Sequence, residues 1–364
     1  MKQSLVTAFL IAVFTSLASA ATDFTETEIT VKNDRDGLRL AGTLTLPAEG
    51  EPKASIVLAT GSGSQNRDEE ILGKKPFKTI ADTLASHGYA VLRFDDRGVG
   101  GSGGDPSKAV NDDFVYDMGL CVAYADSLLG KPVGILGHSE GGLVAIKSAV
   151  RNPAVNFIIT LAAPAFSLDS VTLYQVKTLT AAVGQPGIFE KQRPALQARY
   201  DLLKSSLPSS FLRGKLYLSA LEEVGDAAAL PQVKERIAAE LEVMLSPWYR
   251  DLLRYDPTHD IAVVNVPWLA INGDRDSQVD VNSLARFHEL NHRVDTVVMP
   301  AHNHLFQSCV TGLPDEYATL EGDISDATLR VIVDWMDNLT KSTQNHVQNH
   351  HQHEAGGKAD SAEV

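Results

Sequence analysis

The chain has 364 residues, of which 44% are hydrophobic and 21% are charged, and its formal net charge is -14 at pH 7. This composition is typical of a globular protein, and the length suits one large α/β domain with an insertion. The acidic balance argues against a nucleic-acid partner or an anionic membrane surface, because both require a basic protein surface.

The first twenty residues have the pattern of a secretory signal peptide. A short basic start precedes the nearly continuous apolar run 5–17, and Ala-Ser-Ala at 18–20 forms a small-x-small cleavage site. A membrane anchor is the alternative, but the run is too short to span a bilayer comfortably. We therefore expect cleavage after Ala20, export to the periplasm or beyond, and no stable membrane insertion of the mature protein.

Strand and helix patterns then follow in chain order. Alternating residues at 24–32 and 38–46 predict a β-hairpin with a turn rich in Asn, Asp and Gly. The apolar run 54–59 predicts a strand buried on both faces, as in a parallel sheet. Alternation continues with helix 77–86, strand 89–94, helix 112–129, strand 132–136, helix 140–150 and strand 156–161. This rhythm is typical of βαβ units and a parallel sheet.

The rhythm stops between 165 and 260, where the sequence is helix-like, with Pro residues between the helices. It resumes with strand 267–271, helix 281–290, strand 294–299 and a last amphipathic helix, 324–339. A segment of this length is too long for a loop. We interpret 165–260 as a helical cap inserted into a core formed by 21–164 and 261–340. The alternative is a second independent domain, but the return of the same sheet pattern favours a cap.

The C-terminal segment 341–364 is polar and rich in His. It has almost no apolar residues, so it cannot offset the entropy that ordering would cost. We expect this tail to be disordered.

Ser139 lies in the sequence Gly-His-Ser-Glu-Gly-Gly at 137–142, between a predicted strand and a predicted helix. One interpretation is a nucleophile on a sharp turn, and the other is an ordinary glycine turn. The pattern G-x-S-x-G arises by chance in roughly one chain in ten of this length, so the motif decides little by itself. A serine nucleophile also needs a base within hydrogen-bond reach and an acid that orients the base.

Candidates for the acid and the base follow later predicted strands. Asp276 follows strand 267–271 by a short turn, and Asp274 is its competitor. His304 follows strand 294–299 and opens an apolar stretch expected to be a helical turn, and His302 is the competing base. We favour Asp276 and His304. The chain order serine, acid, histidine, with each residue on a loop after a strand, is that of one large class of serine hydrolases.

An oxyanion hole requires two backbone donors beside the nucleophile. The N–H of Glu140, the residue after Ser139, is the expected first donor, and the loop after strand 54–59 supplies the second. In that loop we nominate Ser62 or Gly63, because glycines let backbone N–H groups approach a developing oxyanion closely. A phosphate-binding loop is the alternative, but no Gly-Lys-Ser/Thr follows.

The chain resembles the α/β-hydrolase superfamily over about residues 24–340. The resemblance rests on four segments: 62–69, 95–102, 137–142 and 303–307. Within it the chain is similar to secreted bacterial carboxylesterases and related prolyl-oligopeptidase-like hydrolases. The resemblance implies a mostly parallel eight-stranded sheet flanked by helices, and a Ser139, Asp276 and His304 triad. The chain departs from the pattern at three positions that look structural: Ser64, Asn66 and Asp96.

Two structural expectations accompany this resemblance. The loop after strand 54–59, which we call the oxyanion loop, is expected to be fixed against the neighbouring turn by a charge network. The members of this network are Arg67, Asp68, Asp95, Asp96 and Arg97. The resemblance also places Cys121 and the segment after Cys309 on opposite faces of the sheet. Since a disulfide needs Cα atoms within about 7 Å, we expect no bond between these two cysteines.

The sequence therefore predicts an exported serine hydrolase that cleaves small carboxylic esters with short to medium acyl chains. This chemistry requires no metal and no organic cofactor, so none is expected. A serine peptidase or a thioesterase on the same fold is the alternative, and a non-catalytic binding protein that uses the same pocket is a further one. The segment before Ala54 is far too short for a propeller domain, which disfavours the peptidase alternative.

Overall fold

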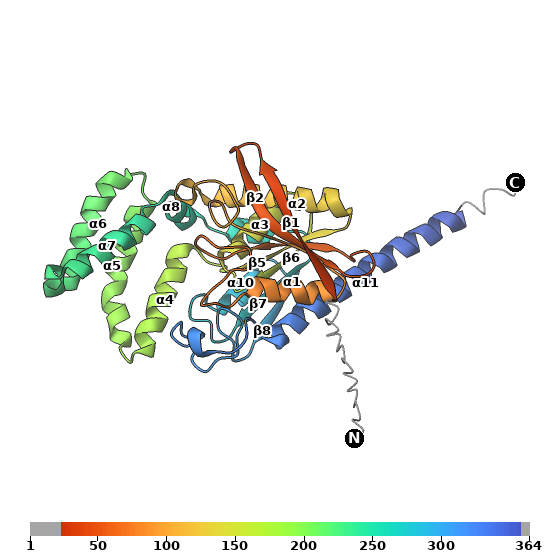
Figure 1. The fold of residues 1–364 in the computed structure, drawn as a ribbon. Coiled ribbons are helices and arrows are strands. Elements are labelled where there is room, and N and C mark those ends of the chain that lie inside the picture. The colour runs from red at the N-terminus through yellow and green to blue at the C-terminus, as the bar shows by residue number, and fades with distance from the viewer. Residues whose placement is uncertain (1–22, 358–364) are drawn as a thin grey trace, which may run out of the picture.

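An eight-stranded sheet forms the centre of the computed structural model, which describes residues 23–357, with side chains through Ser342 (Figure 1). The strand order is β1-β2-β4-β3-β5-β6-β7-β8. β1 pairs antiparallel with β2, β2 pairs antiparallel with β4, and the other neighbours are parallel. The mostly parallel sheet of the sequence prediction is confirmed. The predicted signal peptide, 1–20, lies outside the described residues.

The strands lie close to their predicted positions. The hairpin joins β1 and β2, and the remaining strands follow one another along the chain: β1 (Phe24–Asn33), β2 (Leu38–Pro47), β3 (Ser55–Ala59), β4 (Ala90–Phe94), β5 (Val133–His138), β6 (Val155–Leu161), β7 (Trp268–Gly273) and β8 (Val294–Met299). Every residue of β3, β4, β5 and β7 is buried. Burial on both faces explains why these strands are near-continuous apolar runs rather than alternating ones.

Helices cover both faces of the sheet. One apolar cluster joins the sheet to α2 (Asn111–Leu129), α3 (Glu140–Arg151) and α10 (Asn282–Leu290). A second cluster, on the other face, joins it to α1 (Pro76–Ser86) and α11 (Asp326–Gly357). Cys121 packs in the first cluster, and both Cys121 and Cys309 are free thiols, as predicted.

The segment 165–260, which we call the helical segment, is built of helices that gather on one side of the sheet (Figure 1). They are α4 (Leu168–Ala182), α5 (Pro186–Lys204), α6 (Ser209–Val224), α7 (Pro231–Met244), α8 (Pro247–Arg254) and the start of α9 (Thr258–Val263). The segment has an apolar cluster of its own, made of Tyr200, Leu203, Leu212, Leu216, Ile237, Leu241, Leu245 and Leu253. Within the described part of the chain, no helix combines the length and apolar character that a bilayer-spanning helix requires.

The C-terminal prediction requires a correction. Disorder was expected over 341–364, whereas helix α11 continues to Gly357. No Pro or Gly interrupts the sequence between 341 and Gly356, so nothing in the backbone ends the helix before that point. Residues 358–364 lie outside the described part of the chain.

Candidate active site

Ser139 occupies a sharp turn between β5 and α3. Its backbone has φ 53° and ψ -118°, a strained conformation for a residue other than glycine. The neighbouring glycines permit close packing around it: a Cβ on Gly141 would lie 2.1 Å from the carbonyl oxygen of Ala59. A strained serine held between a buried strand and a helix favours the nucleophile interpretation over an ordinary glycine turn.

His304 and Asp276 form a buried hydrogen-bonded pair. His304 Nδ1 lies 2.8 Å from Asp276 Oδ2, and both residues are at most 4% exposed. Asp276 Oδ1 accepts the backbone N–H groups of Gln278 and Val279 at 2.8 and 2.9 Å. These two bonds orient the carboxylate toward the imidazole. His304 and Ser139 line the same cavity, which has a volume of about 350 Å³.

The competing residues have other partners. Asp274 Oδ1 accepts the N–H of Ala301 at 2.6 Å, which ties the turn after β7 to the turn after β8. His302 lies 2.7 Å from both the Pro300 carbonyl oxygen and the Ser325 hydroxyl, and it does not line the cavity. The geometry thus pairs Asp276 with His304.

The expected helical turn at His304 is wrong. Residues 300–309 contain turns and an isolated β-bridge between His302 and Ser308, and Phe306 has φ 57°, which is incompatible with a right-handed helix. The Asn303 side chain accepts the N–H groups of Leu305 and Gln307 at 3.0 and 2.9 Å. Such local side-chain bonds compete with helix formation, and here they fix the loop that carries His304.

The two nominated donors of the oxyanion loop differ in position. Ser62 lines the cavity of Ser139, whereas Gly63, with φ +94°, lines a neighbouring cavity of about 60 Å³ that shares Gly61 and Glu140 with it. Gly61 donates its N–H to Glu69 Oε1 at 2.6 Å, so that donor is already engaged. Glu140 begins α3 and lines both cavities. The geometry therefore favours Ser62 and Glu140 over Gly63.

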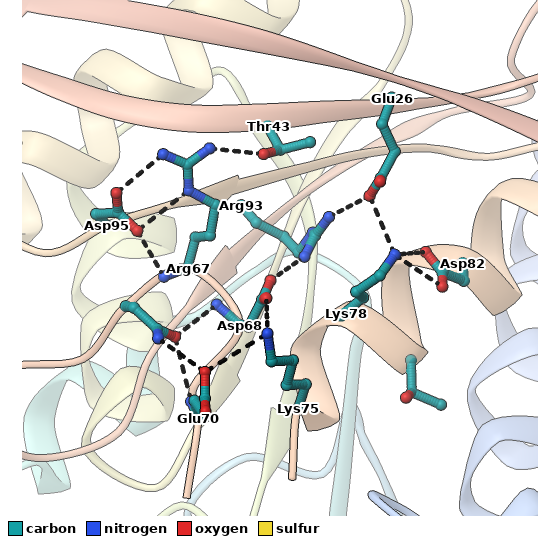
Figure 2. A network of polar contacts seen from close by, with 12 residues as sticks. Glu26, Thr43, Arg67, Asp68, Glu70, Lys75, Lys78, Asp82, Arg93 and Asp95 are labelled. Carbon is teal, nitrogen blue, oxygen red and sulfur yellow. Dashed lines mark hydrogen bonds and ion pairs between the residues drawn. The ribbon is translucent and has the colours of Figure 1, made fainter. Parts of the chain in front are cut away.

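Ion pairs fix the chain just after the oxyanion loop (Figure 2). Arg67 Nη2 lies 2.9 Å from Asp95 Oδ2, and Asp95 Oδ1 accepts the backbone N–H of Arg67 at 2.9 Å. Asp68 is bound by Arg93, a residue that the sequence analysis did not nominate, and Arg93 also binds Glu26 at 2.5 Å. The segment that follows the loop is thus tied to strands β1 and β4.

Asp96 forms hydrogen bonds to the oxyanion loop, whereas Arg97 binds residues outside it. Asp96 accepts the Thr60 hydroxyl at 2.8 Å and the Gln65 N–H at 2.9 Å, so it joins the two ends of the loop. Burial raises the pKa of Asp96 to about 7, although these hydrogen bonds lower it. The prediction for Arg97 was wrong: its guanidinium binds Asp117 of α2 at 2.5 Å and Asp36 at 2.6 Å. Asp117 is buried, and a buried carboxylate requires such a partner.

A buried ion pair beside the site was not predicted from the sequence. His138 Nδ1 lies 2.9 Å from Glu69 Oε1, and His138 Nε2 lies 3.0 Å from the backbone oxygen of His304. Since both ring nitrogens face acceptors, the arrangement favours the imidazolium form, in which both nitrogens donate. Burial lowers the pKa of His138, but the charge and hydrogen bond of Glu69 outweigh it, and the pKa is raised. The pair links the Ser139 turn, the His304 loop and, through Gly61, the oxyanion loop.

A signal for this pair was present in the sequence. His138 adjoins Ser139 in the motif, and Glu69 lies in one of the four segments that carry the resemblance. Nothing in either position showed that the two side chains meet.

The cavity of Ser139 is lined by residues of the sheet core and of the helical segment. Most are apolar or aromatic, among them Leu143, Pro164, Phe166, Leu168, Val171, Tyr249, Leu252, Tyr255, Val279 and Leu305. Among the described residues, its lining includes no Lys or Arg. The volume lies at the lower end of the range of small-molecule sites.

The sheet order, the strained turn at Ser139 and the placement of the later loops define an α/β hydrolase. A family model described as "Serine aminopeptidase, S33" matches residues 50–304. The match spans more than half of the chain, and the protein belongs to this family.

Relatives agree with this class. Esterase EstD of Thermotoga maritima is 27% identical over 318 residues, 86% of this chain and 68% of that protein. The monoglyceride lipase homolog of Monkeypox virus is 32% identical over 124 residues, 33% of this chain and 41% of that protein. The solved structure of a proline iminopeptidase from Mycobacterium smegmatis has a TM-score of 0.53 at 16% identity, covering 87% of this chain and 100% of that one, a likeness of fold. The protein is thus an enzyme of the α/β serine hydrolase and esterase class.

Proposed function

We propose that the protein is a carboxylesterase in which Ser139 is the nucleophile, His304 the general base and Asp276 the residue that orients the base. The observation that carries this proposal is the 2.8 Å bond between His304 Nδ1 and Asp276 Oδ2 at the cavity that Ser139 also lines. Because the carboxylate keeps the proton on Nδ1, the other ring nitrogen is free to take the serine proton.

The proposed reaction proceeds through an acyl-enzyme. Ser139 attacks the ester carbonyl while His304 takes its proton, and the backbone N–H groups of Glu140 and Ser62 stabilise the tetrahedral oxyanion. His304 then returns the proton to the departing alcohol. Water, activated by His304, releases the acyl group as a carboxylic acid.

The cavity lining supports an uncharged ester with a short to medium acyl chain. Apolar side chains dominate, and no Lys or Arg among the described lining residues is available to bind the phosphates of acyl-CoA. This favours an oxygen ester over the thioesterase alternative.

The peptidase alternative has its own support in the family description and in the iminopeptidase fold. A substrate with a free amino group would require a carboxylate partner in a buried cavity. Both lining carboxylates already have partners at Oε1: Glu69 binds His138 and Gly61 there, and Glu140 binds Trp248. The ester is therefore the preferred substrate class.

The helical segment is proposed to act as a cap that sets acyl and alcohol preference. Leu168, Val171 and Thr172 of α4, with Tyr249 and Leu252 of α8, supply part of the cavity wall. Export with cleavage after Ala20 is part of the same proposal and is supported by the sequence of residues 1–20.

Hydrolysis of p-nitrophenyl esters, from acetate to decanoate, tests the function. The wild type and the Ser86→Ala control, which changes an exposed serine, should hydrolyse the shorter esters, and Ser139→Ala should not. Absence of hydrolysis by folded wild type, together with cleavage of aminoacyl p-nitroanilides, would replace the esterase assignment with the peptidase one.

A further inference from the structure

Helix α8 connects the packing of the helical segment to that of the sheet core. It contacts α4, α5 and α7 on one side, and α2 and the short helix η1 (Pro106–Lys108) on the other. Its neighbouring residues Leu252 and Leu253 are buried in different apolar clusters, the first in that of the core and the second in that of the helical segment. Any displacement of the helical segment must therefore be transmitted to α8.

Arg250 strengthens the connection to the helical segment. Its Nε donates to the carbonyl oxygen of Leu203 at 3.0 Å, and its Nη2 donates to that of Ser205 at 2.6 Å. These carbonyls lie at the C-terminal end of α5, where helix carbonyl groups lack intrahelical partners.

On its core side, α8 contacts the residue that follows the nucleophile. Trp248 Nε1 donates to Glu140 Oε1 at 2.7 Å. Asp251, one helical turn further on, accepts the backbone N–H of Asn111 at 3.1 Å, and the Asn111 side chain also donates to Glu140 Oε1 at 3.3 Å. Two side chains of α8 thus bind the same small region beside Ser139.

Glu140 is a buried junction between the two halves of the oxyanion hole. Glu140 is 7% exposed, and its Oε2 has no hydrogen-bond partner among the described residues. Burial raises the pKa of Glu140, while the Trp248 indole, the Ser62 hydroxyl and the Asn111 amide lower it. Glu140 is thus held by α8, and it lines the cavity of Ser139 together with Ser62, the second proposed donor.

We propose that Trp248 is a positioning residue for the oxyanion hole: its indole N–H holds the Glu140 side chain, and with it the Glu140 backbone N–H, in the productive arrangement. The inference rests on the proposed function. An oxyanion donor must lie about 2.7–3.1 Å from the developing charge, and a misplacement of about 1 Å costs up to about 100-fold in rate. The position of the helical segment is thereby coupled to the chemistry at Ser139.

Trp248→Phe tests this proposal because it removes the N–H and keeps most of the ring. Trp335→Phe is the matched control, since the Trp335 indole donates to the Asp295 carboxylate at 2.8 Å. Neither Trp248 nor Trp335 lines the cavity of Ser139. We expect Trp248→Phe to lower kcat for p-nitrophenyl acetate about 10-fold, with KM changed by less than about 3-fold. Trp335→Phe should leave kcat within about 2-fold of the wild type.

A double-mutant cycle separates positioning from packing. Glu140→Leu removes the acceptor, so Trp248→Phe should cause little further loss of kcat in that background. Glu140→Gln keeps an oxygen that can accept the indole bond, and it should retain more activity than Glu140→Leu. A role of Trp248 in packing alone predicts the same loss in both backgrounds.

Two outcomes overturn the inference. In the first, Trp248→Phe and Trp335→Phe have the same kcat. In the second, Trp248→Phe lowers kcat by the same factor in the wild-type background and in the Glu140→Leu background. Either result, with an active wild type and an inactive Ser139→Ala, leaves the proposed function in place. If the wild type hydrolyses no ester, the same variants are compared by the rate at which a fluorophosphonate labels Ser139.

Discussion

The sheet core and the helical segment differ in how firmly they hold their residues. In the core, whole strands are buried, and Ser139 keeps a strained backbone between a buried strand and α3. The helical segment has one small apolar cluster, and its helices and their connections leave large side chains exposed, among them Leu179, Val183, Phe211, Leu218 and Val243. The proposed reacting groups thus lie on the more buried part, and the helical segment lines part of the cavity and is proposed to supply positioning contacts. Catalytic geometry requires a firmly packed support, whereas a substrate wall tolerates adjustment.

The largest expected effect concerns the base in the core. His304→Ala should lower kcat/KM by about 10⁴-fold, because neither proton transfer nor the bond to Asp276 survives. His302→Ala is the matched control, since it removes the competing histidine two residues away. Steady-state ester hydrolysis measures both, and a larger loss in the His302 variant would reverse the assignment.

The buried ion pair beside the site should govern the stability of the core. His138→Gln leaves Glu69 buried without its cation, and a loss of about 3 kcal/mol in the free energy of unfolding is expected at pH 6. Because the folded-state pKa of His138 is raised, the stabilisation is fully present below its ordinary pKa of about 6.5 and is lost as pH rises through the folded value.

Urea unfolding of the wild type and His138→Gln at pH 6 and pH 9 checks this sign. The difference between the two proteins should shrink at the higher pH. A difference that stays constant across this range would show that the imidazolium form does not stabilise the fold.

A substitution in the wall should change substrate preference more than chemistry. Val171 lines the cavity from α4, and Val171→Phe should lower the ratio of decanoate to acetate hydrolysis by about 10-fold, because the larger ring shortens the space for the acyl chain. Val183 lies at the end of the same helix and is 69% exposed, so Val183→Phe is the control. Equal chain-length profiles for both variants would remove α4 from the substrate wall.

The smallest expected effect separates buried from exposed ion pairs. Arg213 and Glu242 pair on the surface of the helical segment, and Arg213→Gln should change the melting temperature by less than about 2 °C. Arg67→Gln, which leaves the buried Asp95 unpaired, should lower it several times more. Thermal unfolding of the two variants provides the comparison, and similar shifts would argue that the Arg67 network does not fix the core.

The sequence predicted those features that depend on local pattern. Apolar runs located the buried strands, and position after a strand nominated Ser139, Asp276 and His304, which the structure brings to one cavity or into hydrogen-bond contact. The pairing of distant side chains was not available from such patterns. Arg97 binds Asp117 because both are buried at one point of the fold, a fact that spacing along the chain does not contain.

Local chemistry also overrode simple periodicity in one loop. The apolar residues after His304 suggested a helical turn, but Phe306 has a left-handed backbone, and the Asn303 side chain accepts the Gln307 N–H that a helix would bond to the Asn303 carbonyl. Likewise, Trp248 belongs to α8, and its bond to Glu140 exists only because the chain returns to the site after more than a hundred residues.

Labelling with a fluorophosphonate, followed by mass spectrometry of the digested protein, tests the identity of the nucleophile most directly. We expect one adduct, on the peptide that contains Ser139, with no adduct in Ser139→Ala and slower labelling in Asp276→Asn. Folded wild-type protein that forms no adduct, or an adduct on another serine, would contradict the assignment of Ser139 as the nucleophile.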